Sequence, residues 1–391
     1  MKKGFVIIPT YNERENIQKV VPILLDVFKK IKRWEMNILV VDDSSPDKTA
    51  QTVQELAAQY KQVHLLLNKQ KAGLGTAYLK GMARAFNDLG ADVIFEFDAD
   101  LSHDPQKIPE FLQKIDAGYD MVLGSRYIKG GGIPSDWGFH RKFLSVVGNW
   151  VVMTILTDFS LHDWTGGYRA LTKEVYEAVE PEMHEEKFTG YTFQIAFLHK
   201  AVRKGFKIIE VPFKFIDRTI GISKLPQEYI KNNLSYLFKV RAKEFFESRV
   251  FKFMIVGGVG AIIQLTSLTL WRRVAVYELA VFLSIETAII SNFLFSNFWT
   301  FADKKIAAKE YPAKFIQFNF ASAGSIVIQT ILAFLGKSLI GLYVLFSLPV
   351  LHLAVDTGLL FAVAGILIGM FWNFFAYTTF IWKKGGTSHE V

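Results

Sequence analysis

The sequence of 391 residues contains no cysteine, so disulfide bonds and thiol chemistry are both excluded. It also lacks a long apolar run at its start, because "MKKGFVIIPT" turns polar within ten positions. That run is too short for the apolar core of a signal peptide. We therefore expect the N-terminal part of the chain to stay in the cytoplasm.

Charge is also scarce, but only in the second part of the chain. Up to about residue 249, apolar runs alternate with charged stretches, as in a globular α/β domain, whereas several long blocks beyond it are nearly uncharged. The net charge is +8, and the 35 phenylalanines are concentrated in these late blocks. A basic protein can bind nucleic acid or an anionic membrane surface. The Phe-rich blocks favour the membrane, and we expect no nucleic-acid partner.

The uncharged blocks are long enough to cross a bilayer. Three of them contain no charged residue, and a fourth, 274–301, contains only Glu278 and Glu286. A membrane-spanning helix needs about 20 mainly apolar residues. An alternative is that these are very apolar helices buried in a soluble protein, but four such blocks favour the membrane. We predict four spans, at about 253–271, 276–300, 315–336 and 357–382.

Basic residues flank the predicted spans unequally. Only three, Arg272, Arg273 and Lys337, lie on one side. Loops rich in Lys and Arg stay on the cytoplasmic side of a membrane. The pattern therefore predicts an integral, multi-pass membrane protein whose two ends both face the cytoplasm. Ten basic residues lie on that side: Arg241, Lys243, Arg249, Lys252, Lys304, Lys305, Lys309, Lys314, Lys383 and Lys384.

The membrane part also looks duplicated. "KFMIVGGVGAIIQ" from Lys252 is similar to "KFIQFNFASAGSIVIQ" from Lys314, and "NFLFSNFWTF" from Asn292 is similar to "NFFAYTTFIW" from Asn373. We interpret this as two helical hairpins in parallel repeat. Glu286 lies inside a span, where an acid is either functional or hydrogen-bonded between helices.

The first 215 residues alternate strand and helix patterns, which predicts a doubly wound, mostly parallel α/β sheet. We expect a catalytic domain at 1–225, amphipathic interfacial helices or a linker at 226–249, the membrane domain at 250–384 and a tail at 385–391. The predicted strands are 4–9, 37–42, 62–67, 92–97 and 120–124, and the predicted helices are 14–31, 47–60, 74–89 and 105–117.

Polar clusters follow four of the predicted strands. They read "PTYNE" (9–13), "DDSSPD" (42–47), "KAGLG" (71–75) and "DADLSHD" (98–104). Each alone would be an ordinary turn. In open α/β sheets, however, ligands bind beyond the carboxyl ends of the strands. Four clusters at one edge therefore predict a binding site.

The residue types in these clusters favour a phosphate ligand with a metal. "KAGLG" matches neither the Walker A nor the GxGxxG pattern. Asp98 and Asp100 alternate in an extended segment and offer oxygens that suit Mg²⁺ or Mn²⁺ shared with substrate phosphates. Asp104 before Pro105 fits a helix N-cap, and His103 fits a structural turn. Cations that phosphates would need follow at Arg126, Arg141, Arg169, Arg218 and Lys224.

These motifs together resemble a known family. "IIPTYNE", "VVDDSSPD", "GLGTAY", "DADLSHDP", "GSRY", "GGYRA" and "DRTIGISKL", in this order, are similar to motifs of dolichyl-phosphate mannosyltransferases and related polyprenyl-phosphate glycosyltransferases. The resemblance covers residues 4 to about 240 and implies an inverting enzyme of glycosyltransferase-A fold. Residues 250–382 resemble the four-span GtrA-type domain that follows many such catalytic domains.

The resemblance also implies roles for individual residues. Asp98, Asp100, Arg126, Arg218 and Lys224 would be catalytic. Pro9, Tyr11, Glu13, Val41 and Asp43 match the residues that hold the nucleotide, and Asp98, Ala99 and Asp100 match the metal–diphosphate motif. Ser102 would complete the metal shell, although some relatives have Gln there. Arg126, Arg141 and Ser145 match positions that receive the lipid phosphate, and Arg218 and Lys224 match a basic loop over the donor, in which Ile222 replaces a usual acid.

Arg141 and Ser145 are four residues apart, so they would share one face of a helix. That helix continues as an apolar stretch, typical either of a membrane-interface helix or of an amphipathic core helix. Both interpretations are open from periodicity alone.

The predicted reaction is transfer of one hexose to a polyisoprenyl phosphate with inversion. GDP-mannose is the favoured donor and UDP-glucose the second. A processive polysaccharide synthase would share the fold, but four short spans and the missing "QxxRW" motif argue against it. The alternative from another class is a flippase or scaffold for a lipid-linked sugar.

Overall fold

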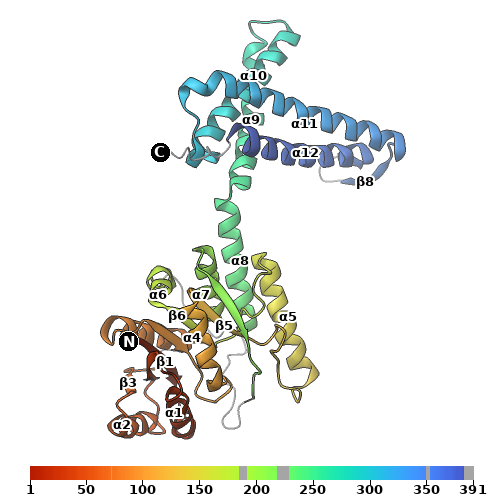
Figure 1. Ribbon diagram of the computed structural model, residues 1–391. Coiled ribbons are helices and arrows are strands. Elements are labelled where there is room, and N and C mark those ends of the chain that lie inside the picture. The colour runs from red at the N-terminus through yellow and green to blue at the C-terminus, as the bar shows by residue number, and fades with distance from the viewer. Residues whose placement is uncertain (72, 185–191, 218–228, 349–352, 383–391) are drawn as a thin grey trace. The chain divides into compact units, whose positions relative to one another are not determined.

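The computed structural model divides into two compact units, Met1–Arg241 and Ala242–Val391. It describes every residue except 72, 185–191, 218–228, 349–352 and 383–391 (Figure 1). The division at 241 falls within the segment 226–249, for which a linker was predicted. The two units are described separately below.

The first unit is built on one sheet in which seven strands are described. Their order is β3-β2-β1-β4-β6-β5-β7, and β6 runs antiparallel to both of its neighbours. All other neighbouring pairs are parallel. The strands are β1 (Lys2–Thr10), β2 (Trp34–Asp42), β3 (Val63–Leu67), β4 (Val93–Glu96), β5 (Met121–Ser125), β6 (Arg169–Thr172) and β7 (Ile208–Pro212).

The mostly parallel sheet and its first five strands are therefore confirmed, but β6 and β7 were not predicted. Both are short, and each carries a charge, Arg169 in β6 and Glu210 in β7. A charged residue in a run of four or five obscures the apolar pattern that marks a buried strand. The strand character of these segments comes from pairing with distant strands, which local sequence does not encode.

Helices cover both faces of the sheet. Phe5 and Ile7 of β1 point into one apolar core, and Val6 and Ile8 point into the other. This alternation, with both faces buried, is typical of sheets made by β-α-β crossovers. The helices are α1 (Arg14–Phe28), α2 (Thr49–Gln59), α3 (Leu74–Ala83), α4 (Ile108–Asp116), α5 (Phe139–Leu156), α6 (Lys173–Val179), α7 (Thr192–Arg203) and α8 (Tyr229–Glu247), with shorter turns η1 (Arg84–Asp88), η2 (Pro105–Lys107) and η3 (Glu180–Met183).

In the second unit, helices occupy all four predicted span regions. Two of them, Arg249–Trp271 and Ala308–Leu339, are long and apolar enough to cross a membrane, and Leu367–Ile381 is a shorter apolar helix. The count of four spans stays a prediction. The elements are α9 (Arg249–Trp271), α10 (Tyr277–Phe295), η4 (Ser296–Thr300), η5 (Ala302–Lys304), η6 (Ala308–Glu310), α11 (Tyr311–Leu339), β8 (Val344–Leu348), β9 (Leu353–Asp356), α12 (Thr357–Ala376) and η8 (Tyr377–Ile381).

The internal repeat is visible in this unit. Helix α9 packs mainly on α10, and α11 packs mainly on α12, so each half is a hairpin. When Asn292 is aligned with Asn373, the π-helical turn η4 falls opposite the π-helical turn η8. The residues after the two turns, Phe301 and Trp382, stack on each other with ring centroids 4.5 Å apart. The two halves therefore share an unusual backbone feature at equivalent positions, which supports a parallel repeat.

The first hairpin depends on close approach at Gly260. A Cβ atom at this position would overlap the side-chain carboxamide of Asn292 on α10. We expect Gly260→Ala to destabilise the full-length protein by about 1–3 kcal/mol, because a close-packed seam must open to admit the methyl group. The measurement is the thermal unfolding midpoint in detergent.

Gly257→Ala is the matched control, since nothing lies within 4 Å of a Cβ atom there. It should leave the midpoint unchanged or raise it slightly, because alanine favours helix. Asn292→Ala should restore the midpoint of Gly260→Ala by removing the overlapping group. Equal midpoints for Gly260→Ala and Gly257→Ala would show that the seam is not tight.

Candidate active site

The carboxyl ends of β2, β1 and β4 lie side by side, because these strands are neighbours and parallel. Pro9 of β1 is level with Val41 of β2, and the Asp43 amide donates to the Thr10 carbonyl (3.0 Å). The loops beyond these strands are also joined, since the Asn12 amide donates to Ser45 Oγ (2.9 Å). The structure thus brings the predicted clusters after β1, β2 and β4 to one edge of the sheet.

Asp43 is held on both of its oxygens. Asn68 Nδ2 donates to Oδ1 (2.7 Å), and the Gly73 amide donates to Oδ2 (3.1 Å). Lys80 Nζ in turn donates to Asn68 Oδ1 (3.1 Å). Gly73 has φ +86°, a conformation that other residues rarely adopt. Asp43 is therefore oriented by the loop after β3, and the role of Asn68 was not predicted.

Tyr11 and Glu13 complete this side of the edge. The Tyr11 ring lies under Lys71 Nζ, 4.0 Å from the ring centroid. Glu13 Oε2 accepts from Asn16 Nδ2 (2.6 Å), and the Glu13 amide donates to Thr49 Oγ1 (3.1 Å). All five residues assigned to the nucleotide (Pro9, Tyr11, Glu13, Val41 and Asp43) thus lie at the ends of β1 and β2 or in the loops that follow.

The acidic motif begins two residues after β4 ends. Asp98 has a side chain that is 40% exposed, Asp100 is partly buried, and Ala99 between them is buried. Asp104 Oδ1 accepts from the Gln106 amide (2.9 Å) at the start of η2, so the predicted N-cap is confirmed. Two carboxylates of the motif are therefore at least partly exposed beyond the end of β4, and the third caps a helix.

The donor atoms of this motif fit a metal shared with a ligand better than a protein cage. Within the described ranges, no three His, Cys, Asp or Glu residues are grouped so as to hold an ion. Ser102 donates its amide to Asp100 Oδ1 (3.1 Å), and its buried Oγ has no hydrogen-bond partner among the described residues. Two carboxylates and one hydroxyl suit Mg²⁺ or Mn²⁺ only if phosphate oxygens supply further ligands.

His103 supports the backbone of this motif. Its Nδ1 accepts from the Asp98 amide (3.1 Å), which leaves the proton on Nε2, 3.6 Å from Asp98 Oδ2. The ring is buried and stacks on Tyr168 at 4.8 Å between centroids. Burial lowers the pKa of His103, so the ring is neutral. These contacts agree with the structural role that the sequence suggested.

Arg169 is fully buried and donates to backbone carbonyls, so its expected contact with a phosphate is wrong. It is fully buried in β6, directly across from Glu96 of β4. Its guanidinium donates to the carbonyls of Gln194 (2.7 Å) and Trp164 (3.1 Å). Arg169 is therefore a charge inside the protein and not a ligand.

Glu96 is a fully buried acid for which the sequence predicted no role. Burial raises the pKa of Glu96 to about 7, while Arg169 acts to lower it and Asp98 to raise it. Among the described residues, neither of its carboxylate oxygens has a hydrogen-bond partner. Glu96 and Asp98 lie in the same run, "FEFD", and each follows a phenylalanine, so their sequence neighbours do not distinguish them.

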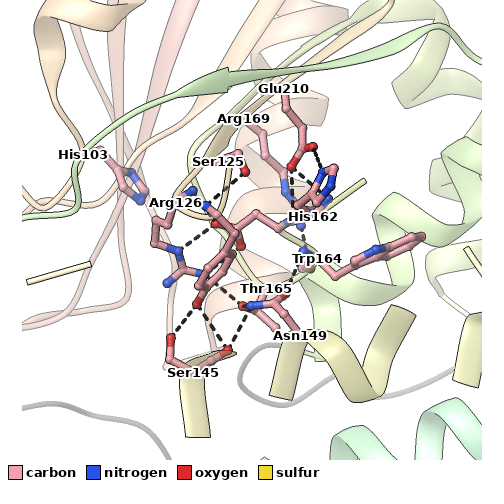
Figure 2. A network of polar contacts seen from close by, with 12 residues as sticks. His103, Ser125, Arg126, Ser145, Asn149, His162, Trp164, Thr165, Arg169 and Glu210 are labelled. Carbon is pink, nitrogen blue, oxygen red and sulfur yellow. Dashed lines mark hydrogen bonds and ion pairs between the residues drawn. The ribbon is translucent and has the colours of Figure 1, made fainter. Parts of the chain in front are cut away.

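Arg126, just beyond β5, is held by a buried acid (Figure 2). Arg126 Nε and Nη2 donate to the two oxygens of Asp163, both at 2.7 Å, and the Arg126 amide donates to Oδ2 (3.0 Å). Nη2 also donates to Thr165 Oγ1 (2.9 Å). The Arg126 side chain is 9% exposed and the Asp163 side chain 0%. Asp163 was not predicted, because it is 37 residues away in the chain.

Ser145 belongs to the same network, whereas Arg141 does not. Both lie on α5, which confirms the predicted helix. Ser145 Oγ and the Tyr127 hydroxyl are 2.6 Å apart. Arg141 donates to Asp217 (2.6 Å), and its guanidinium lies over the Trp137 ring, 3.7 Å from the centroid. Arg218 and Lys224, predicted to close over the donor, lie outside the described residues.

Two family models match the chain in succession. The one described as "Glycosyl transferase family 2" matches residues 5–179, and the one described as "GtrA/DPMS, transmembrane domain" matches residues 252–382. The first therefore contains the edge formed by β1, β2 and β4, and the second contains the duplicated hairpins.

Three curated proteins are similar over much of the chain. "Dolichol-phosphate mannosyltransferase" of Pyrococcus furiosus is 34% identical over 343 residues, covering 85% of this chain and 92% of that protein. "Polyprenol monophosphomannose synthase" of Mycolicibacterium smegmatis is 39% identical, covering 61% and 86%. "Undecaprenyl-phosphate mannosyltransferase" of Micrococcus luteus is 37% identical, covering 56% and 86%. With both domains present in order and nearly the whole of the first relative covered, the chain belongs to the dolichol-phosphate mannosyltransferase family, as a family 2 glycosyltransferase with a GtrA/DPMS transmembrane domain.

Proposed function

We propose that this protein transfers one mannose from GDP-mannose to a polyisoprenyl phosphate, with inversion at the anomeric carbon. The observation that carries the proposal is the pair Asp98 and Asp100, which follows β4 at the same edge as Asp43. The names of all three relatives describe mannosyl transfer, two of them to a named lipid phosphate. The motifs "GLGTAY" and "DADLSHDP" also resemble those of mannosyl enzymes.

The donor nucleotide would bind across the ends of β1 and β2. Asp43 is fixed by Asn68 and the Gly73 amide, so its orientation is set before the nucleotide arrives. A preorganised polar group costs less free energy to engage than a mobile one. Pro9, Tyr11, Glu13 and Val41 would line the same site, and Arg218 and Lys224 would close over the diphosphate.

Asp98 and Asp100 would hold Mg²⁺ or Mn²⁺ against the diphosphate, with Ser102 as a further oxygen ligand. A bound divalent ion would supply positive charge to the departing diphosphate. Ala99, which separates the two aspartates in the chain, buries only a methyl group. The His103 contact to the Asp98 amide keeps the backbone of the motif in place.

The acceptor needs positioning more than it needs a base. A phosphate monoester has a second pKa near 6, so it is largely dianionic at neutral pH. One of its oxygens would attack the anomeric carbon as the bond to the diphosphate breaks, with no proton to remove. Arg126, Arg141 and Ser145 would receive this phosphate. Because the acceptor carries no proton on the attacking oxygen, His103, which is neutral and buried, is not needed as a base.

Helix α5 would bring these groups to the membrane surface. It exposes large apolar side chains at helical spacing, while Asn149, Val152 and Leu156 on another face are buried. Such a helix suits the boundary between lipid headgroups and acyl chains. The exposed face of α5 comprises Phe139, Phe143, Val146 and Trp150.

We place the catalytic domain and both termini in the cytoplasm and assign four spans to the second unit.

Replacing Asp100 with Asn should reduce transfer by about 100-fold or more. Without a firmly held metal ion, the negative charge on the departing diphosphate loses its stabilisation. The assay is radiolabelled mannose moving from GDP-mannose into the lipid phase, with the purified full-length chain and Mn²⁺. Asp104→Asn is the matched control, because Asn caps a helix as well as Asp does. It should keep wild-type turnover, and wild-type turnover in Asp100→Asn would exclude the metal assignment.

A donor panel tests the sugar. With one polyisoprenyl phosphate, we expect transfer from GDP-mannose, and little or none from UDP-glucose or UDP-GlcNAc. Omitting Mn²⁺ and Mg²⁺ and adding a chelator should abolish the reaction. Preferred transfer of glucose would overturn the donor assignment. Absence of transfer from every donor would favour a scaffold or flippase.

A further inference from the structure

We propose that Asp163 is a positioning residue for the acceptor phosphate. It fixes the Arg126 guanidinium, and Thr165 and Asn149 keep that guanidinium in register with Ser145. Asp163 would touch neither substrate and would act only through Arg126. The inference rests on the proposed function, in which Arg126 and Ser145 receive the lipid phosphate.

The Arg126–Asp163 contact leaves the arginine little freedom to turn. Two parallel N–H donors of the guanidinium meet the two carboxylate oxygens, and the Arg126 backbone amide binds the same acid. A two-pronged pair of this kind fixes the plane of the guanidinium as well as its position. Arginine otherwise has many rotamers, whose loss on binding a phosphate costs free energy. Asp163 restricts the Arg126 rotamers in the folded protein, so this entropy is not lost again when the phosphate binds.

Asp163 is itself anchored to the sheet. Glu210 of β7 accepts from the His162 and Asp163 amides with one oxygen, both at 3.0 Å, and its other oxygen contacts His162 Nδ1 (2.8 Å). A Cβ atom at Gly166 would lie 3.1 Å from Asp163 Oδ1, so this glycine leaves room for the carboxylate. The acid that orients Arg126 is therefore connected to a strand rather than carried on a free loop.

The same segment connects Arg126 to α5. Thr165 Oγ1 accepts from Arg126 Nη2 (2.9 Å) and from Asn149 Nδ2 (3.2 Å). Asn149 Oδ1 accepts from the Trp164 amide (2.9 Å), and its Nδ2 also donates to the Ser145 carbonyl (3.2 Å). In the view of Figure 2, Asn149 and Thr165 lie to the right of Arg126 and Ser145 and are hydrogen-bonded to them. The two groups assigned to the phosphate thus share one hydrogen-bonded frame.

Stability alone is a weak reason for this pair. Burying an ion pair costs desolvation, and apolar replacements are often as stable. Asp163 also offsets the positive charge of Arg126, so the pair attracts a phosphate less strongly than Arg126 alone would. Its advantage is orientation, and a misplacement of about 1 Å can cost about 100-fold in rate.

The experiment measures both substrates with the full-length chain in lipid. We expect Asp163→Asn to lower kcat/KM for the polyisoprenyl phosphate by about 10- to 100-fold while KM for GDP-mannose changes less than about twofold. Thr165→Val, which removes one hydroxyl at constant shape, should lower the same parameter by roughly tenfold. The matched control is Asp92→Asn, which removes a carboxylate that binds the Lys3 amide at the start of β1. It should leave both parameters unchanged.

A double-mutant cycle separates positioning from a general loss of structure. In an Arg126→Lys background, Asp163→Asn should have little further effect on kcat/KM for the acceptor, because both changes remove the same contact. Full additivity in the cycle, or an equal change in KM for GDP-mannose, would overturn the proposal. So would unchanged acceptor kinetics in both Asp163→Asn and Thr165→Val. A wild-type chain that transfers no mannose would instead refute the proposed function.

Discussion

The buried guanidinium of Arg169 is the charge around which the catalytic unit is organised. It lies in β6, across from Glu96 of β4, and donates to the Trp164 carbonyl next to Asp163. A buried cation is tolerated only when acids and carbonyls compensate it. The acidic motif after β4 and the segment that holds Arg126 are therefore adjacent to the same internal charge.

In the proposed function, the edge of the sheet would separate two kinds of anion binding. On the β4 side, Asp98 and Asp100 repel phosphate unless a divalent ion lies between them. On the β5 side, Arg126, held by Asp163, would meet a phosphate directly. A diphosphate and a phosphate monoester are both negative, so a shared basic surface would not distinguish them. A divalent cation between two carboxylates on one side and an oriented guanidinium on the other would assign each anion to its own place.

What the sequence could predict depends on how local each signal is. Strands β1 to β5, the helix with Arg141 and Ser145 and the Asp104 cap all depend on neighbours within a few residues, and all were predicted. Glu96 and Arg169 could not be separated from functional charges, because only the structure shows that both side chains are fully buried. Asn68 and Asp163 were missed because the side chains that they hold, Asp43 and Arg126, are 25 and 37 residues away.

The membrane unit repeats a backbone shape without repeating its chemistry. At aligned positions, Asn297 accepts from Trp382 Nε1 (3.1 Å) and the Ile306 amide (2.8 Å), whereas Thr378 donates only to carbonyls of its own helix among the hydrogen bonds described. Asn297 thus joins the end of the first hairpin to the end of the second, next to the Phe301–Trp382 stack. Polar side chains within helical membrane domains gain most when they bond between helices. Among the described residues, the first half of the repeat supplies the acceptor of this link, Asn297, and the second half supplies its donor, Trp382, so the two equivalent positions Asn297 and Thr378 do not play the same part.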